Sequence, residues 1–222
     1  MSELFSIQLQ NRQHQGRDGV WLDLPTTTEQ VQAALRQIGI SSDNPQGLFI
    51  SGYFAEEEKR FAIPYNMVLA SNVDELNFLA ARLETLSAGE RAELNAALQA
   101  PQSELSSIGK ITDFPENVEY YVYLPDVRGP AQLGDYYLNR SGMVNMPDEW
   151  KGGIDTAQFG RYVAQQEQGA FTQYGYLVKS GDEWQKVHEG QPVPEEYRVL
   201  SFPVPEVMRD AANIPPPVQP ET

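Results

Sequence analysis

The side chains in this sequence that could do chemistry are almost all carboxylates. The chain has 31 acidic and 16 basic residues, a formal net charge of −15, two histidines and no cysteine. Without cysteine, thiolate catalysis and Cys-ligated zinc are excluded. His14 and His188 stand alone in the sequence, and neither has a second histidine at the spacing that brings two imidazoles to one metal ion. The sequence therefore predicts no metal site and no cofactor.

One pair of carboxylates has the neighbours of a catalytic site. Asp148 and Glu149 precede Trp150, and two carboxyl groups beside a bound sugar are the machinery of glycoside hydrolysis. A first helical turn in which Trp150 anchors the loop explains the same residues. Neither a Gly-x-Ser-x-Gly turn nor a P-loop is present. We therefore expect a protein without catalytic activity, and a carboxylate-based hydrolase is the alternative.

The excess of acidic residues excludes a simple nucleic-acid-binding protein, because Lys and Arg are needed to neutralise phosphates. An acidic surface favours solubility and basic partners instead. The excess is greatest in the middle of the chain. Residues 74–155 contain 14 acids and 6 bases, net −8, whereas residues 1–73 are net −3 and residues 156–222 are net −4. No run of about 18 apolar residues and no signal peptide is present, so we expect a cytoplasmic protein without a membrane span.

The expected fold class is α+β, an elongated chain of small units. Residues 1–70 predict a β-β-α-β unit, because apolar residues alternate in 5–9 and 20–24 and a helical pattern separates them from an apolar run at 47–53. The capping box predicted for that helix is Thr26-Thr27-Thr28-Glu29, with Glu29 reaching back, and Gly39 is its predicted stop.

A helical hairpin is predicted for residues 71–105. Ser71 or Asn72 caps its first helix, a capping box from Ser87 to Glu90 begins its second, and Pro101 ends it.

Residues 106–180 predict a second α+β unit. Its predicted elements are a strand at 118–124, a short helix at 133–138, a helix capped by Asp155 with Gln158 that stops at Gly169, and a strand at 174–178. Residues 181–222 predict one further strand at 197–202 and then a mobile tail, because prolines at 203, 205 and 215–217 prevent packed structure. A ligand for a proline-recognition domain is the alternative for that tail.

Five segments, in the same order, resemble the ArdA family of antirestriction proteins. Residues 19–25, Gly-Val-Trp-Leu-Asp-Leu-Pro, look like the family's glycine-tryptophan strand, and residues 74–83 are similar to its central helix. Residues 117–125 resemble its tyrosine strand, residues 133–137 the helix that follows, and residues 154–176 its closing segment. The resemblance covers residues 4–180.

The resemblance implies a function without catalysis. ArdA proteins look like elongated acidic dimers whose carboxylates imitate the phosphates of bent B-DNA. They occupy the DNA groove of type I restriction–modification enzymes and so protect incoming mobile DNA. The implied partner is such an enzyme, with no direct contact to nucleic acid or membrane. A generic acidic protein-interaction module is the alternative. Aromatic residues are dense in 120–137 and 159–176, which predicts a homodimer through the C-terminal unit.

The residues expected to imitate phosphates are the carboxylates of the acidic middle segment. We predict that they lie on outward helix faces or in loops. The set is Asp74, Glu75, Glu84, Glu90, Glu93, Glu104, Asp113, Glu116, Glu119, Asp126, Asp135, Asp148, Glu149 and Asp155.

Overall fold

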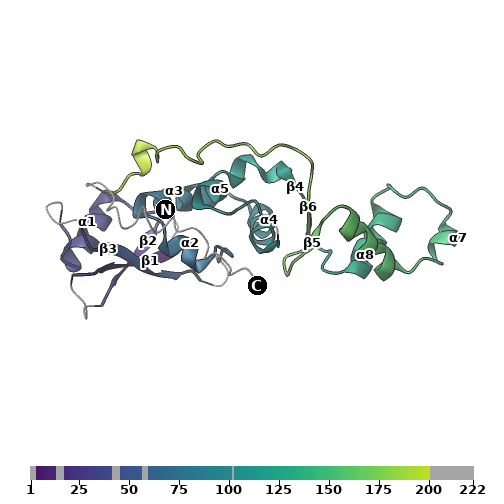
Figure 1. Cartoon of the computed structure of the whole chain (residues 1–222), viewed down its shortest axis with the longest axis horizontal. Helices are drawn as coiled ribbons and strands as arrows, with labels where there is room; N and C mark the ends of the chain where they lie inside the picture. The colour runs from purple at the N-terminus through teal and green to yellow at the C-terminus, as the bar shows by residue number, and fades with distance from the viewer. Residues whose placement is uncertain (1–3, 14–17, 42–45, 57–59, 102, 201–222) are drawn as a thin grey trace, which may run out of the picture. The chain divides into compact units, whose positions relative to one another are not determined.

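The computed structural model describes residues 4–13, 18–41, 46–56, 60–101 and 103–200. Helices and two three-stranded antiparallel sheets form in these ranges, which confirms the α+β class (Figure 1). Two compact units are present: unit 1 contains residues 1–85, 107–112 and 188–222, and unit 2 contains residues 86–106 and 113–187. Each unit is therefore assembled from separate stretches of the chain. The predicted domain boundaries at residues 70, 105 and 180 stay a prediction.

The sheet of unit 1 has the predicted β-β-α-β order. β1 (Phe5–Asn11) is the central strand, flanked by β2 (Val20–Leu24) and β3 (Leu48–Phe54), and α1 (Thr28–Gln37) follows β2 in sequence. The odd-numbered residues of β1 are buried and the even-numbered ones are not. Helices α1 and α3 (Val73–Glu84) lie on one side of this sheet (Figure 1). The apolar face of the sheet is thus covered by helices, as period-two alternation requires.

Thr27 caps the N-terminus of α1, and the residue that completes its capping box differs from the predicted one. The Thr27 side chain accepts the backbone N–H of Gln30, and the Gln30 side chain accepts the N–H of Thr27 at 3.2 Å. The prediction that Glu29 closes this box was wrong, because the third helical position after Thr27 is Gln30. The predicted stop is confirmed: α1 ends at Gln37, and Gly39 takes a positive φ of 73°.

Both helices predicted in residues 71–105 form, α3 in unit 1 and α4 (Ala88–Gln99) in unit 2. Asn72 caps α3 and forms a capping box with Glu75, and Ser87 and Glu90 form the predicted box of α4. Unit 1 also contains the short helices α2 (Tyr65–Leu69) and α5 (Ile108–Thr112). None of the helices in the described ranges is both long and apolar enough to cross a membrane.

Residues 188–200, here called the C-terminal strap, are held against α3 by buried polar groups. The Asp74 carboxylate accepts the N–H groups of Val199 and Leu200 at 2.7 and 2.9 Å. The Asn77 side chain donates to the Tyr197 carbonyl at 3.0 Å. The strand predicted for residues 197–202 was wrong over its described part, because residues Glu195–Tyr197 form a 3₁₀ turn (η5). Residues 201 and 202, and the tail predicted after them, lie outside the described ranges.

An aromatic contact completes the attachment of the strap. The Phe78 ring of α3 lies 4.9 Å from the His188 ring and 4.7 Å from the Tyr197 ring. His188 therefore takes part in packing, and His14 lies outside the described residues.

Unit 2 combines a small sheet with helices. The sheet order is β4 (Tyr121–Leu124), β6 (Tyr176–Lys179), β5 (Ala170–Phe171). The helical elements after α4 are η2 (Phe114–Glu116), η3 (Val118–Tyr120), α6 (Pro130–Asp135), the π-helix η4 (Tyr136–Arg140), α7 (Asp148–Lys151) and α8 (Thr156–Gln166).

Four predicted elements in unit 2 have different boundaries in the structure, and one of them is the strand predicted at 174–178, which extends from Tyr176 to Lys179. The strand predicted at 118–124 begins only at Tyr121, because a 3₁₀ turn occupies the three residues before it. The helix predicted at 133–138 begins at Pro130, whose fixed φ suits a first helical position. The helix predicted to stop at Gly169 ends at Gln166, and Gln168 takes the positive φ of 54°.

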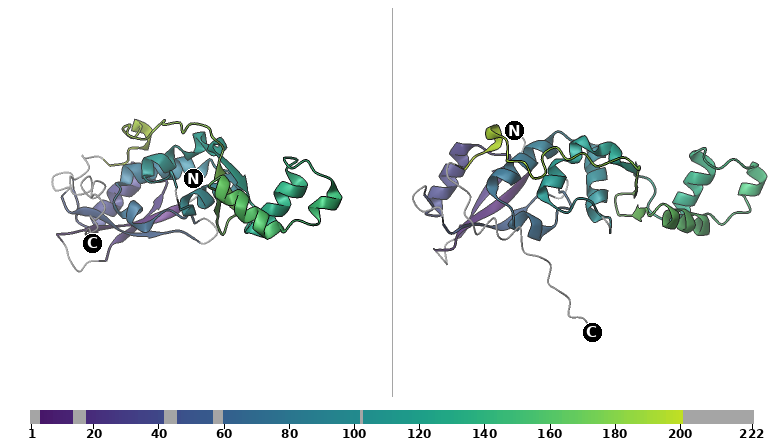
Figure 2. Two further views of the ribbon diagram at one scale, coloured as in Figure 1. Left: turned by 45° about the vertical axis from the view of Figure 1, so that its right-hand side comes forward. Right: turned by 45° about the horizontal axis from the view of Figure 1, so that its top comes forward.

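Two glycines allow α6 and α8 to pack with their backbones in close approach (Figure 2). A Cβ atom on Gly134 would lie 2.0 Å from the Thr156 carbonyl oxygen. A Cβ atom on Gly160 would lie 1.8 Å from the Pro130 carbonyl oxygen. Both distances are far below van der Waals contact, and the obstacle is backbone, so no side-chain rotation can relieve them.

A carboxylate bridges two tyrosines beside this helix pair. Glu167, directly after α8, accepts the hydroxyl groups of Tyr137 and Tyr176 at 2.8 and 2.6 Å. Tyr176 is fully buried and belongs to the same apolar cluster as Val127, Leu133 and Ala164. Burial, together with the hydrogen bond to Glu167, raises the pKa of both tyrosines. The bridge therefore satisfies phenol groups that would otherwise be buried without partners.

We expect Gly160→Ala to destabilise the protein by about 2 kcal/mol or more, because overpacking that requires backbone movement costs about 1–3 kcal/mol. Urea unfolding measures the effect. Gly89→Ala is the matched control: its helical position in α4 is open, with the nearest atom 4.0 Å from the place that a Cβ atom would take, and alanine there should be neutral or stabilising. Equal stability of Gly160→Ala and the parent chain would contradict the close helix contact.

Candidate acidic binding surface

The structure separates the 14 predicted acidic residues by their exposure to solvent. Six are exposed, five are half-buried and three are buried. The exposed residues are Glu116, Glu119, Asp126, Asp148, Glu149 and Asp155. The half-buried residues are Glu75, Glu84, Glu90, Glu104 and Asp135. The prediction of an outward position was wrong for the buried residues Asp74, Glu93 and Asp113.

All six exposed carboxylates belong to unit 2, and short helical elements and turns position them. Glu116 and Glu119 lie in the 3₁₀ turns before β4, and Asp126 lies in the turn after it. Backbone in such turns faces water, so side chains there extend from the surface. The six exposed residues are referred to below as the acidic surface of unit 2.

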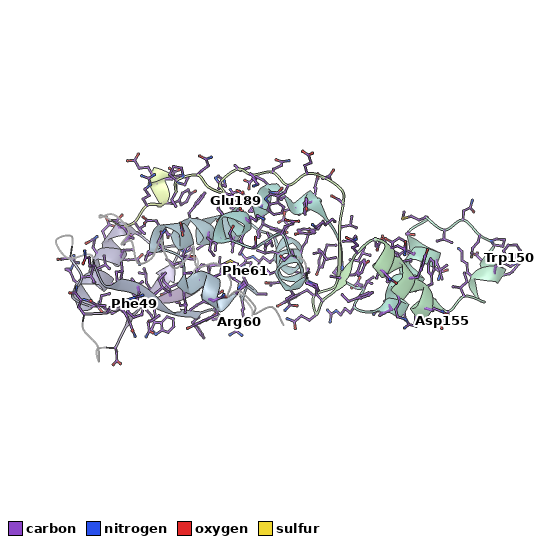
Figure 3. All side chains as sticks on the ribbon, in the orientation of Figure 1. Phe49, Arg60, Phe61, Trp150, Asp155 and Glu189 are labelled. Atoms are coloured by element: carbon purple, nitrogen blue, oxygen red, sulfur yellow. The ribbon has the colours of Figure 1, made fainter. Side chains whose placement is uncertain are left out.

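The other three members of the acidic surface lie at helix N-termini. Asp148 and Glu149 occupy the first turn of α7, near Trp150 at the far edge of unit 2 in Figure 3. Asp155 caps α8 and accepts the N–H groups of Ala157 and Gln158 at 2.9 and 3.0 Å. The predicted cap is thus confirmed. Partial positive charge at a helix N-terminus favours acidic side chains there, and all three of these side chains are exposed.

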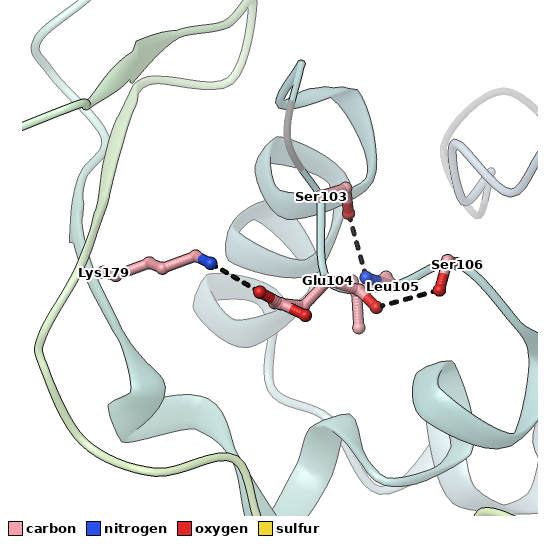
Figure 4. A network of polar contacts seen from close by, with 5 residues as sticks. All are labelled: Ser103, Glu104, Leu105, Ser106 and Lys179. Atoms are coloured by element: carbon pink, nitrogen blue, oxygen red, sulfur yellow. Dashed lines mark hydrogen bonds and ion pairs between the residues drawn. The ribbon is translucent and has the colours of Figure 1, made fainter.

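The half-buried carboxylates are engaged within the protein. Glu104 pairs with Lys179 across unit 2, and the Ser106 hydroxyl donates to the Glu104 carbonyl (Figure 4). Asp135 pairs with Arg140 at 2.8 Å. Hydrogen bonding to Asn139, followed by the Arg140 charge, lowers the pKa of Asp135. Each paired cation reduces the negative potential that the carboxylate projects into solvent.

The three buried carboxylates differ in what surrounds them. Asp74 holds the C-terminal strap, and burial raises its pKa against the opposing effect of two backbone N–H groups and Arg198. Asp113 is fully buried before η2, where its carbonyl accepts the Asn117 side chain at 2.8 Å. Glu93 lies in α4, and its Oε1 has no hydrogen-bond partner in the part of the chain that the structure describes. Burial, followed by repulsion from Glu90, raises the pKa of Glu93 to about 7.

Two further exposed acids of unit 2 were not in the predicted set. Asp182 and Glu183 follow β6 and are exposed, and Asp182 accepts the Ser180 hydroxyl at 2.9 Å. The sequence Ser-Gly-Asp-Glu directly after an apolar strand was the signal that could have identified this acidic turn. Including these residues, unit 2 has 14 acidic and 7 basic residues, net −7.

The geometry of Asp148 and Glu149 does not suit acid–base catalysis. The Asp148 side chain is 93% exposed and pairs with Lys151 at 2.9 Å. Hydrogen bonding to Lys151, and its charge, lower the pKa of Asp148, whereas a general acid at neutral pH needs a raised pKa and a water-excluded site. Among the described residues, no group of three or more His, Cys, Asp or Glu side chains could hold a metal ion.

The raised pKa of Glu93 predicts a specific pH dependence. An unfolded glutamate titrates near 4.5 and the folded one near 7, so the folded chain binds this proton more tightly. Its contribution to stability is therefore complete below pH 4.5 and is lost as the pH rises through 7. We expect Glu93→Gln to be more stable than the parent chain at pH 8 and to lose less stability between pH 4.5 and 8. Urea unfolding at several pH values tests this, with exposed Glu116→Gln as the control; identical pH profiles for Glu93→Gln and the parent would contradict it.

Comparison with known proteins gives one family. The chain matches the family described as Antirestriction protein (ArdA) over residues 15–178 of its 222 residues. A search of curated proteins finds no match. The family match includes all six residues of the acidic surface of unit 2 and ends before the C-terminal strap.

Proposed function

Because the chain belongs to the ArdA family of antirestriction proteins, we propose that it inhibits restriction by binding a type I restriction–modification enzyme in place of duplex DNA. The resemblance of residues 4–180 to the ArdA family implies this partner. The proposal places the protein in the cytoplasm, where such enzymes meet incoming DNA. It assigns no catalytic step and no cofactor to the chain.

The observation that carries the proposal is the acidic surface of unit 2. Six carboxylates within residues 116–155 are exposed. Of these, Asp148 pairs with Lys151, and Asp155 accepts two backbone N–H groups. Duplex DNA carries about one negative charge per 1.7 Å of axis, and enzymes bind it largely through Lys and Arg. Exposed carboxylates attract those same cations, and charge complementarity accelerates the encounter.

The packing beneath this surface supports the same proposal. A surface that replaces a stiff duplex must hold its charges in place without the enzyme's help, since ordering a flexible surface costs binding free energy. The glycine contact between α6 and α8 and the Glu167 bridge fix helix α8, whose N-terminus carries Asp155. A generic acidic interaction module is the alternative, and it differs because it requires no competition with DNA.

We further propose a homodimer formed through unit 2. The surface that we expect to form the dimer contact differs from the aromatic segments predicted from the sequence. Many of the aromatic residues of 120–137 and 159–176 pack against one another within the unit, as in the Tyr136–Tyr137 and Phe171–Tyr176 pairs. The large apolar side chains left exposed in unit 2 include Met143, Trp150 and Tyr162, at 74%, 69% and 60%. Exposed apolar side chains of this size favour burial against a partner.

Sedimentation equilibrium should therefore give twice the mass of the 24.9 kDa chain. Replacing Met143 and Trp150 with glutamate should shift the distribution toward monomer, because a charged side chain cannot enter an apolar interface without a large desolvation cost. Phe54→Glu, in unit 1, is the control and should leave the mass unchanged. A parent chain that sediments only as monomer would refute the dimer.

The central prediction is competition with DNA. The purified protein should displace duplex from a type I enzyme, and its affinity should fall steeply with salt, because exposed charges are screened within about 8–10 Å at 0.1–0.15 M. Converting the six acidic-surface residues together to their amides should abolish displacement. Single replacements should cost little, since one exposed ion pair contributes about 0–1 kcal/mol.

A second six-residue variant changes the net charge by the same amount as the acidic-surface variant and serves as its control. Six exposed acids of unit 1 can be converted to amides instead, and these are Asp18, Asp23, Glu29, Glu56, Glu195 and Glu196. This control should retain displacement. If both six-residue variants lose the same amount of competition, net charge alone decides the interaction and the acidic surface of unit 2 has no special role. If the parent chain displaces no duplex from type I enzymes at low salt, the proposed function is wrong.

A further inference from the structure

The face of the unit 1 sheet opposite to α1 and α3 carries a tryptophan laid across the central strand. Gln8 of β1 pairs with Trp21 of β2 on one side and with Gly52 of β3 on the other. The Trp21 ring extends over β1 so far that a Cβ atom on Gly52 would lie 3.0 Å from ring atom Cη2. The glycine at position 52 therefore makes room for the indole ring. This arrangement gives the sheet a flat aromatic surface near its middle.

Further aromatic side chains extend this surface. Phe54 pairs in register with Ser6 and is 53% exposed, and its ring lies 6.5 Å from that of Trp21, which is 49% exposed. Phe49 pairs with Gln10 on the same face. Tyr65, 51% exposed, donates its hydroxyl to the Ser51 carbonyl at the β3 edge. We call Trp21, Phe49 and Phe54 the aromatic face of unit 1, and Tyr65 lies beside it at the β3 edge.

Aromatic residues grouped on a small antiparallel sheet bind one ligand class particularly well. Proline-rich segments in the polyproline II conformation dock on aromatic surfaces, because their preformed shape costs little entropy on binding. A single exposed aromatic residue needs no partner, but several on one face form a site that such a segment fits. Aromatic ring faces contact proline rings in such complexes, and side-chain amides such as those of Gln8 and Gln10 can donate to the solvated backbone carbonyls.

This chain contains such a segment, and its attachment point lies in the same unit. Residues 214–217 are Ile-Pro-Pro-Pro, with a further proline at 220. Leu200 is fixed in unit 1 by its N–H bond to Asp74. The 15 residues from there to Pro215 reach about 45 Å at 3.1 Å per residue. A unit of this size has a radius of gyration of about 14 Å, so the proline segment can pass around its edge to the sheet.

We propose that the aromatic face of unit 1 binds the Ile214–Pro217 segment of the same chain. Charge assists the contact: the Arg12 guanidinium lies 5.0 Å over the Phe49 ring, and residues 201–222 carry three acids and one base. The interaction lies outside the acidic surface of unit 2, and the proline segment lies beyond the family match. Its failure would therefore leave the proposed antirestriction function untouched.

The test compares the full-length chain with a full-length variant in which Pro215, Pro216 and Pro217 are serine. The readout is the indole N–H signal of Trp21 in a ¹H–¹⁵N spectrum, assigned with Trp21→Phe. The variant should shift this signal and leave the Trp150 signal in place. A synthetic peptide with the sequence of residues 210–222 should return the Trp21 signal of the variant toward the parent position. A matched control replaces Ala211, Ala212 and Asn213 with serine and should shift nothing.

The results of these experiments show whether the aromatic face binds the proline segment of its own chain, the segment of a second copy, or neither. An unchanged Trp21 signal in the triple-proline variant, with no response to the peptide, overturns the proposal. A shift that depends on protein concentration in the parent chain assigns the segment to a second copy and overturns binding within one chain. Phe54→Ser, which removes an exposed ring without touching the core, should weaken the peptide response at least several-fold. An unaltered response in that variant also contradicts the aromatic face as the site.

Discussion

The cost of removing a carboxylate from water organises the acidic residues of this protein. An ionised group can leave water only where hydrogen-bond donors or cations replace the lost hydration. At Asp74, two backbone N–H groups oppose the rise in pKa that burial causes. The half-buried Glu167 accepts two tyrosine hydroxyls. One oxygen of Glu93 has no hydrogen-bond partner among the described residues, and burial raises the pKa of this group to about 7. Asp113 is also buried, whereas the other acids of the predicted set are exposed or half-buried, and the exposed ones in unit 2 supply the candidate binding charges.

The interior of unit 2 allows this surface to be rigid although the unit is small. Its apolar cluster is centred on Tyr176, Leu133 and Ala164, and the two glycines bring the backbones of α6 and α8 closer than larger residues permit. Close packing holds helix ends in place, and the N-terminus of α8 carries Asp155. The acids of the surface contribute little to the core, so natural variation could change their number without unfolding the unit.

The C-terminal strap adds a layer to unit 1 beyond the family match. Its contacts with Asp74, Asn77 and Phe78 attach residues 188–200 to the central helix α3. A segment that would otherwise be a terminal extension thus becomes part of the packed unit. The proline-rich sequence beyond it starts from a fixed point, which raises its effective concentration at the sheet of the same chain. The two units therefore have separate tasks in the proposals: charge presentation in unit 2 and attachment of the chain's own extension in unit 1.

The sequence by itself determined most of what depends on local chemistry. Period-two alternation predicted β1 and β2, capping residues predicted the starts of α3, α4 and α8, and the family resemblance was already readable from short segments. These features follow from neighbours within a few residues, so no tertiary information is needed. The capping-box pattern did not distinguish Glu29 from the adjacent Gln30 as the residue that bonds back to Thr27.

Only the tertiary structure decided which carboxylates face water. Asp74 is in the first turn of α3, where the helix terminus favours an acid, but its partners Val199 and Leu200 are more than a hundred residues away. Glu93 in α4 was predicted to lie on an outward helix face, yet it is buried in the folded chain. The close contact at Gly134 and Gly160, and the aromatic face formed by strands β2 and β3 across β1, likewise join residues distant in sequence. Burial is a property of the assembled fold, because it depends on what packs over a residue, which the residue and its neighbours do not specify.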